Sequence, residues 1–273
     1  MKNLKNINLK KQEQHPFHLV DPSPWPIITS LSLYSLALGF IMYFHYFKGG
    51  LFQLFCGLFL ITLSLFRWFF DIIAEATYEG QHTFKVQQNV LLGMLLFITS
   101  EIMFFFAFFW AFFHFSLSPS IALFGVWPPI KGLWILDYTA LPLLNTAILL
   151  SSGVTVTWAH RGMVAGQRLD TVYGLVATIA YGALFSLFQK YEYDHATFSI
   201  NDGAYGSVFY MTTGFHGLHV FIGTVFLFIC LIRHNNYQFF KNHHVGFVCV
   251  IWYWHFVDVV WIFLFLCVYL WGA

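Results

Sequence analysis

The chain has 273 residues, of which 59% are hydrophobic, 22% aromatic and only 9% charged. Because an ordinary soluble domain is about a quarter charged, this composition excludes a soluble globular protein. The net charge of +1 gives no reason to expect a nucleic-acid partner. The four cysteines lie in apolar runs without Cys-x-x-Cys spacing, so no disulfide framework is predicted.

Seven apolar runs lie between the charged residues, each near or above the roughly 20 residues that a helix needs to cross a bilayer. The first has no small-residue cleavage site after it, so we expect it to be retained. The sequence therefore predicts an all-α membrane protein with seven transmembrane helices, at residues 25–47, 49–66, 86–116, 138–160, 171–189, 203–232 and 242–273. The second run becomes long enough when it is extended to residue 70, and the third and seventh are each interrupted by one acidic residue, Glu101 and Asp258.

The order of these runs predicts three parts. Residues 1–24 form an N-terminal surface segment, held extended by Pro22 and Pro24. Residues 25–83 form a hairpin of two transmembrane helices with a tight connection at 48–50. Residues 84–273 contain the other five helices as one structural unit, after a polar stretch at 71–85.

The basic residues predict the orientation, because Lys and Arg in short loops stay on the side from which a chain is inserted. Only Lys48, Lys131 and Lys190 of the 13 fall on the side opposite the N-terminus. The other ten lie on the N-terminal side, namely Lys2, Lys5, Lys10, Lys11, Arg67, Lys85, Arg161, Arg168, Arg233 and Lys241.

Glu101 is the only charged residue between 86 and 130. A carboxyl group in hydrocarbon is neutral, partnered or turned toward a protein interior, and is a candidate functional site. A rise of about 1.5 Å per residue places it near the middle of the bilayer, at a depth similar to that of His216 and His219. These residues form either a carboxyl–histidine cluster that handles protons, or a structural set in which each histidine bonds a backbone carbonyl or a hydroxyl.

The last span carries a second polar pair, His255 and Asp258, at positions i and i+3 of one helix face. Structural pairing and direct proton handling both remain open for it. The histidines that are closest in sequence are too near to be opposite ligands of one haem, and no His-Glu-x-x-His motif is present. We therefore expect no redox metal in this chain.

A further set of residues lies at one interfacial level, where cations pair with phosphate head groups and Trp sits at the glycerol depth. These candidate phospholipid-binding residues are Arg67, Trp68, Glu75, His82 and Arg233. The alternative is an ordinary positively charged membrane face.

The polar residues in these contexts resemble the cytochrome c oxidase subunit III family. The matching stretches span the chain in order: HPFHLVDPSPWP (15–26), EATYEGQHT (75–83), SEIMFFFAFFWAFFH (100–114), PLLNTAILLSSG (142–153), TGFHGLHVFIGT (213–224) and WYWHFVDVVW (252–261). Two departures concern the head-group region, where Phe70 and Ala74 stand at positions that are commonly arginine in the family.

The resemblance implies a two-helix hairpin splayed from a five-helix bundle by a V-shaped cleft that holds phospholipids. It implies a non-catalytic core subunit of respiratory complex IV, without haem or copper of its own, because haem a and copper belong to partner subunits. It also implies direct contact with subunit I, assembly with subunit II and accessory subunits, and support of proton uptake during oxygen reduction.

By the same resemblance, Glu101 corresponds to a carbodiimide-reactive intramembrane carboxylate. The expected location is the mitochondrial inner membrane, with the N-terminus in the matrix and the C-terminus in the intermembrane space. Two alternatives remain: subunit III of a bacterial quinol oxidase, and an autonomous proton-coupled transporter. The first is disfavoured by the amino-terminal hairpin, and the second by the lack of internal repeats.

Overall fold

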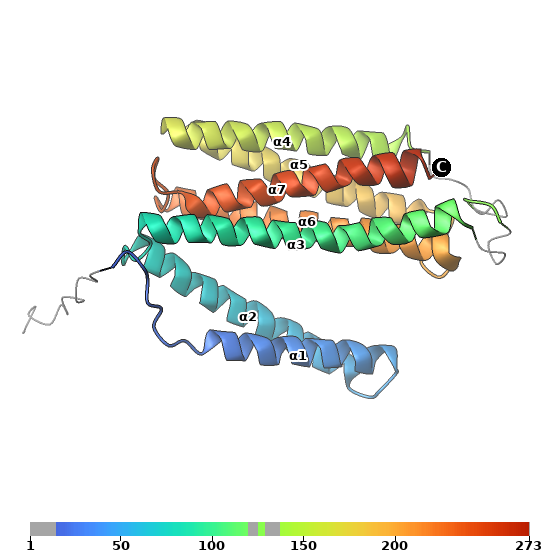
Figure 1. Cartoon of the computed structure of the whole chain (residues 1–273), viewed down its shortest axis with the longest axis horizontal. Helices are drawn as coiled ribbons and strands as arrows, with labels where there is room; N and C mark the ends of the chain where they lie inside the picture. The colour runs from blue at the N-terminus through green and yellow to red at the C-terminus, as the bar shows by residue number, and fades with distance from the viewer. Residues whose placement is uncertain (1–14, 120–124, 129–136, 273) are drawn as a thin grey trace, which may run out of the picture. The chain divides into compact units, whose positions relative to one another are not determined.

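The computed structural model describes residues 15–119, 125–128 and 137–272. Within these residues all the regular secondary-structure elements are helices. All seven α-helices are long and apolar enough to cross a membrane, which confirms the predicted fold class. Their bounds, labelled in Figure 1, are α1 Trp25–Phe44, α2 Gly50–Thr77, α3 Phe84–Leu117, α4 Leu141–Ala165, α5 Arg168–His195, α6 Gly203–Asn235 and α7 Val245–Leu264. A π-helix over Phe265–Leu270 continues α7.

Some sequence predictions fall outside the described residues. Residues 1–14 of the predicted surface segment do so, together with the four lysines they contain. Lys131, predicted to lie on the side opposite the N-terminus, does so as well.

The polar stretch at 71–85 is helical at both of its ends. The α2 helix continues to Thr77 and α3 already begins at Phe84, so only a short connection separates them. The end of an apolar run marks the edge of the hydrocarbon, but polar residues beyond that edge still favour helix because every backbone group stays hydrogen-bonded. The helix stops where the chain turns at Gly80, whose φ is +67°.

The chain forms two compact units, Met1–Asn89 and Val90–Ala273. The sequence-based division at residue 83/84 follows the gap between α2 and α3. By its contacts, however, the start of α3 belongs with the first unit.

The first unit is built on the α1–α2 hairpin. Two glycines let the helices meet backbone to backbone, because a Cβ on Gly39 would lie 2.5 Å from Leu54 N and one on Gly57 would lie 2.5 Å from Leu36 N. Small residues of this kind are how helices pack closely in a bilayer, where burying apolar surface gives no advantage over lipid. Hydrogen bonds cross the same interface, from Thr29 to Ser64 and from Gln53 to Ser35, at 3.2 Å and 2.8 Å.

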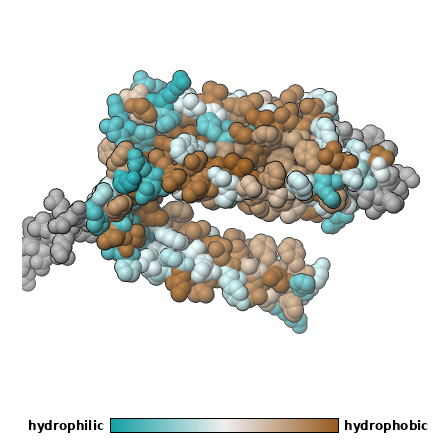
Figure 2. Space-filling view, in the orientation of Figure 1, coloured by the Kyte–Doolittle hydropathy of each residue, from teal (hydrophilic) through white to brown (hydrophobic). Residues whose placement is uncertain are grey.

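The second unit is a helix bundle whose core follows α7. Trp254, Val257, Trp261 and Leu264 of this helix are fully or almost fully buried. α7 packs against α4 and α6, and α5 packs against α4 and α6 in turn. On the face that Figure 2 shows, hydrophobic side chains cover most of the length of the helices in each unit, as expected of lipid-facing surfaces.

Candidate functional site

Glu101 and His219 form a hydrogen-bonded pair between α3 and α6. Nε2 of His219 lies 2.9 Å from Oε2 of Glu101, and Nδ1 of the same ring lies 2.6 Å from the carbonyl oxygen of Phe215. The side chains of Glu101 and His219 are 22% and 10% exposed. The structure thus brings the intramembrane carboxyl group together with one of the two histidines that the sequence placed at its depth.

The hydrogen bonds of this pair define how many protons it holds. A carbonyl oxygen only accepts, so Nδ1 of His219 carries a hydrogen that it donates to Phe215. The short contact on the other side of the ring needs a second hydrogen, because the lone pairs of Nε2 and of a carboxylate oxygen repel each other. That hydrogen belongs either to a protonated Glu101 or to an imidazolium at His219. In both forms the pair as a whole carries no net charge, which is the inexpensive state inside a membrane.

Aromatic rings surround this pair. Phe105 meets the His219 ring edge-on at 5.0 Å, Tyr253 stacks on it at 6.3 Å, and Phe256 lies 6.3 Å away. These rings, from α3 and α7, fix the orientation of the imidazole. They also exclude water from part of the site, which strengthens the hydrogen bond between Glu101 and His219.

His216 has a different role from His219, although the two are only one helical turn apart. It is 1% exposed, and its Nε2 donates to the carbonyl oxygen of Val257 at 3.2 Å. Its ring packs against Phe185 and Trp261, at 5.5 Å and 5.1 Å between centroids. This geometry fits the structural interpretation, in which a histidine bonds a backbone carbonyl on a neighbouring helix. The two histidines thus have different partners, since His219 bonds the carboxyl group of Glu101 and His216 bonds only backbone.

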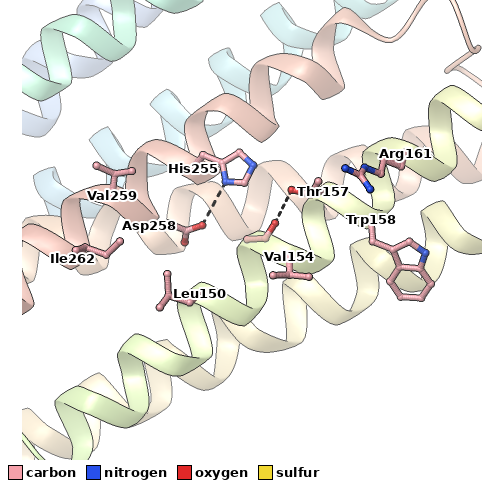
Figure 3. Close-up of a pocket in the computed structure, with 10 residues that line it drawn as sticks. Leu150, Val154, Thr157, Trp158, Arg161, His255, Asp258, Val259 and Ile262 are labelled. Carbon is pink, nitrogen blue, oxygen red and sulfur yellow. Dashed lines mark hydrogen bonds and ion pairs between the residues drawn. The ribbon is translucent and has the colours of Figure 1, made fainter.

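His255 and Asp258 lie as close as their i,i+3 spacing predicts. Nδ1 of His255 is 3.7 Å from Oδ2 of Asp258, an ion-pair distance that is longer than a hydrogen bond. The Asp258 side chain is 8% exposed and that of His255 is 44% exposed. As Figure 3 shows, both line an open groove between α4 and α7 of about 710 Å³, together with Val154, Trp158 and Arg161.

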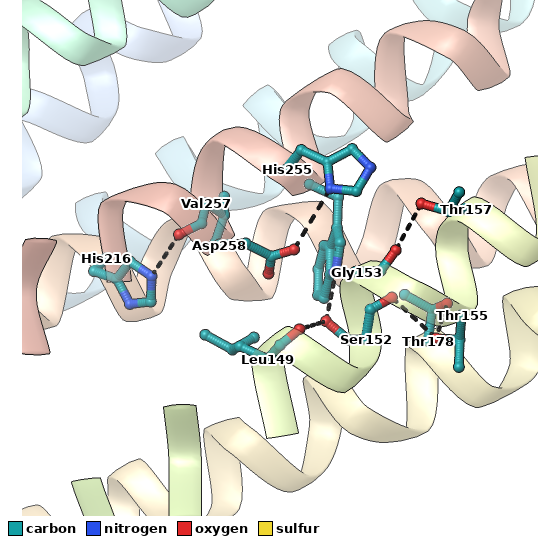
Figure 4. Close-up of polar contacts among 11 residues, drawn as sticks. Leu149, Ser152, Gly153, Thr155, Thr157, Thr178, His216, His255, Val257 and Asp258 are labelled. Atoms are coloured by element: carbon teal, nitrogen blue, oxygen red, sulfur yellow. Dashed lines mark hydrogen bonds and ion pairs between the residues drawn. The ribbon is translucent and has the colours of Figure 1, made fainter. Parts of the chain in front are cut away.

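The neighbours of this pair on α4 were not singled out by the sequence. A Cβ on Gly153 would lie 2.9 Å from Oδ2 of Asp258, so an added methyl group would force the carboxyl group to shift. Next to it, Ser152 accepts a hydrogen bond from the buried indole of Trp254 at 2.9 Å (Figure 4). The available signal was the Ser-Ser-Gly run inside an apolar helix, because small and hydroxyl residues mark helix contacts in membranes.

We expect Gly153→Ala to destabilise the second unit by about 1 kcal/mol, because the added methyl group displaces the Asp258 carboxyl group from its place against α4. Thermal release of the subunit from the purified complex measures this cost. Gly217→Ala is the matched control, since a Cβ there meets nothing within 4 Å in the described structure. If the methyl group acts through Asp258, Gly153→Ala adds no further cost in an Asp258→Ala background. If Gly153→Ala destabilises the Asp258→Ala protein as much as it destabilises the wild type, the added methyl group does not act through Asp258.

The candidate phospholipid-binding residues fall in both units. Glu75 of the first unit lies with His82 and His18, while Arg67 is exposed and Trp68 half-buried on α2. In the second unit, Nε of Arg233 donates to Oε1 of Gln238 at 3.1 Å, and its guanidinium lies 4.3 Å from the Phe239 ring centre. Glu75 and His82 therefore lie close together in the first unit, whereas Arg233 belongs to the second unit.

Comparison with known proteins identifies the family. The model of the cytochrome c oxidase subunit III family matches residues 15–273. Cytochrome c oxidase subunit 3 of Pylaiella littoralis is 54% identical over 263 residues, which cover 96% of each chain. The corresponding protein of Chondrus crispus is 53% identical over 97% of each chain, and that of Triticum aestivum is 53% identical over 96% of this chain and 99% of its own. On a match of this extent, the chain belongs to the cytochrome c oxidase subunit III family.

Proposed function

We propose that this chain, a multi-pass subunit of cytochrome c oxidase that assembles with the other subunits of complex IV, serves as a non-catalytic core subunit. In this role it stabilises subunit I by direct contact, holds structural phospholipids and supports proton uptake while the complex reduces oxygen and pumps protons. Haem a and copper are held by partner subunits. Subunit II and accessory subunits complete the assembly.

The observation that carries this proposal is the use of the polar side chains inside the membrane. Glu101 and His219 satisfy each other, and the second ring nitrogen of His219 is bonded to Phe215. His216 donates to the backbone of α7, and His255 lies beside Asp258. Intramembrane histidines that bond a carboxyl group or a backbone carbonyl in this way support a scaffold that holds a proton at one partly buried pair, rather than a site that ligates an electron carrier.

The lipid role is supported by the surface and the ends of the helices. The α1, α2 and α3 helices expose many large apolar side chains, which suit acyl chains. Basic, acidic and aromatic side chains near the helix ends suit head groups, and we propose that Arg67, Trp68, Glu75, His82 and Arg233 bind them.

The location is proposed on two grounds. Curated relatives from algae, plants and animals match over nearly the whole chain, which suits the mitochondrial inner membrane. The distribution of Lys and Arg supports an N-terminus in the matrix and a C-terminus in the intermembrane space. Labelling of the His15→Cys and Trp271→Cys variants from each side of sealed inner-membrane vesicles tests this orientation. We expect the cysteine at position 15 to react from the matrix side and the one at position 271 from the intermembrane-space side.

Removing the subunit from the purified complex tests the proposed role. We expect the first turnovers of oxygen reduction to continue at a rate within about 2-fold of that of the intact complex, because the electron path lies elsewhere. Activity should then decay faster during sustained turnover, and adding the subunit back with phospholipid should slow the decay. Immediate loss of all oxygen reduction would contradict a non-catalytic role.

A further inference from the structure

Three side chains with metal-ligating atoms converge in the first unit from three separate segments. His18 lies before α1, Glu75 lies near the end of α2, and His82 lies in the connection to α3. One ligand atom from each lies within 4.8 Å of the others, and all three residues are half-buried. Nδ1 of His18 is 3.9 Å from Oε2 of Glu75, and the two imidazole rings are 6.1 Å apart.

Hydrogen bonds hold the three segments in place around this cluster. The Thr83 hydroxyl, next to His82, donates to the carbonyl oxygen of Pro16, two residues before His18. The backbone N–H of Gln81 donates to the carbonyl oxygen of Glu75 at 3.1 Å, which folds the connection back over the end of α2. Gln87 of α3 bonds the carbonyl oxygen of His82 at 2.9 Å. The backbone positions of all three residues are thus fixed by contacts that do not use their ligand atoms.

We propose that His18, Glu75 and His82 bind a divalent transition-metal ion, for which Zn²⁺ is the best match. Two imidazoles and one carboxylate are ligands that zinc prefers, and zinc binds them at about 2.0–2.2 Å. In a tetrahedral site, ligand atoms at such distances from the metal stand roughly 3.3 Å apart. Side-chain rotations that move each ligand atom by about an ångström are therefore enough to form the site. Mg²⁺ and Ca²⁺ prefer sets of oxygen ligands, and two histidines make this site unsuitable for them.

Metal bound here ties the N-terminal segment to the end of α2 and to the start of α3. It leaves one position of a tetrahedral zinc ion open for water or another oxygen ligand. The proposal uses only residues of the first unit. It shares Glu75 and His82 with the proposed head-group residues, and the Zn²⁺ protection experiment tests the metal site without requiring bound phospholipid.

Zinc protection of individual histidines tests the site in the intact complex. The complex is freed of loosely bound metal with a chelator and treated with diethylpyrocarbonate, with or without Zn²⁺, and modified histidines are mapped by peptide mass spectrometry. We expect Zn²⁺ to slow modification of His18 and His82, and Mg²⁺ to have no effect. His15 is the internal control, because it is exposed in the same segment and outside the cluster. Equal modification of His18 and His82 with and without Zn²⁺ would overturn the proposal.

A ligand variant gives a second measurement. Glu75→Gln removes the only negative charge among the three ligands, so the zinc concentration that half-protects His18 should rise by about 10-fold or more. Asp21→Asn, which changes an exposed carboxylate in the same segment as His18, should leave that concentration unchanged. Unchanged protection in Glu75→Gln would exclude Glu75 as a ligand and with it the proposed site. Should Glu75→Gln fail to assemble, the wild-type protection experiment still decides.

Discussion

Replacing Gly39 or Gly57 by valine is expected to break the packing of the α1–α2 hairpin. The first side-chain atom alone would lie 2.5 Å from backbone nitrogen of the facing helix, at Leu54 and Leu36 respectively. Backbone cannot rotate away as a side chain can, so the helices must separate and lose both the contact and the hydrogen bonds that cross it. We expect a cost of about 3 kcal/mol or more, at the upper end of what overpacking causes.

Protease sensitivity of the connection between α1 and α2 measures the effect, together with the temperature at which the subunit leaves the complex. Gly93→Val is the matched control, because it makes the same substitution in a membrane helix at a position where a Cβ meets nothing within 4 Å in the described structure. Wild-type behaviour of Gly39→Val and Gly57→Val would show that the two helices do not meet at these glycines.

Variants of Glu101 distinguish the effect of the Glu101–His219 hydrogen bond on stability from the effect of the proton that this partly buried pair holds. Glu101→Ala leaves Nε2 of His219 without a partner, which we expect to destabilise the subunit by about 1–2 kcal/mol. Glu101→Gln should cost less, because the amide can donate to the same nitrogen. Glu101→Leu combined with His219→Phe should recover much of the stability, because neither partner is then left unsatisfied.

Turnover measurements then show whether the proton of the pair matters. The first turnovers should be within about 2-fold of wild type in all these variants, since none of them touches the proposed electron path. If the pair supports proton uptake, Glu101→Gln should inactivate faster than wild type during sustained turnover even though its stability is nearly kept. A Glu101→Gln complex that lasts as long as wild type would reduce the pair to a structural contact.

The number and type of helices could be predicted from sequence because the bilayer leaves little choice. Without water in the hydrocarbon, every backbone group must bond within its own segment, so a long apolar run has to be a helix. The helix ends could not be read in the same way. Residues from Asp71 to Thr77 were left out of the predicted span because they include charged residues, yet they continue α2 as helix.

Predictability within the candidate site depended on distance along the chain. His255 and Asp258 meet because residues three apart share a helix face, which spacing alone reveals. Glu101 could be placed near two histidines by depth. Which of the two it contacts depends on how α6 is rotated about its axis when packed, and in the structure His219 faces Glu101 while His216 faces Val257. The role of Gly153 was hidden for the same reason, because it depends on where α4 meets α7.

The proposed non-catalytic role is tested most directly by counting the haem and copper in the complex before and after this subunit is removed. Detergent releases the chain from the purified complex, and haem and copper are then quantified in the released fraction and in the remainder, with the intact complex as reference. We predict that the remainder keeps all of its haem a and copper, and that the released chain carries neither. Haem or copper leaving with this chain in a one-to-one ratio would show that it holds an electron carrier and is not a scaffold.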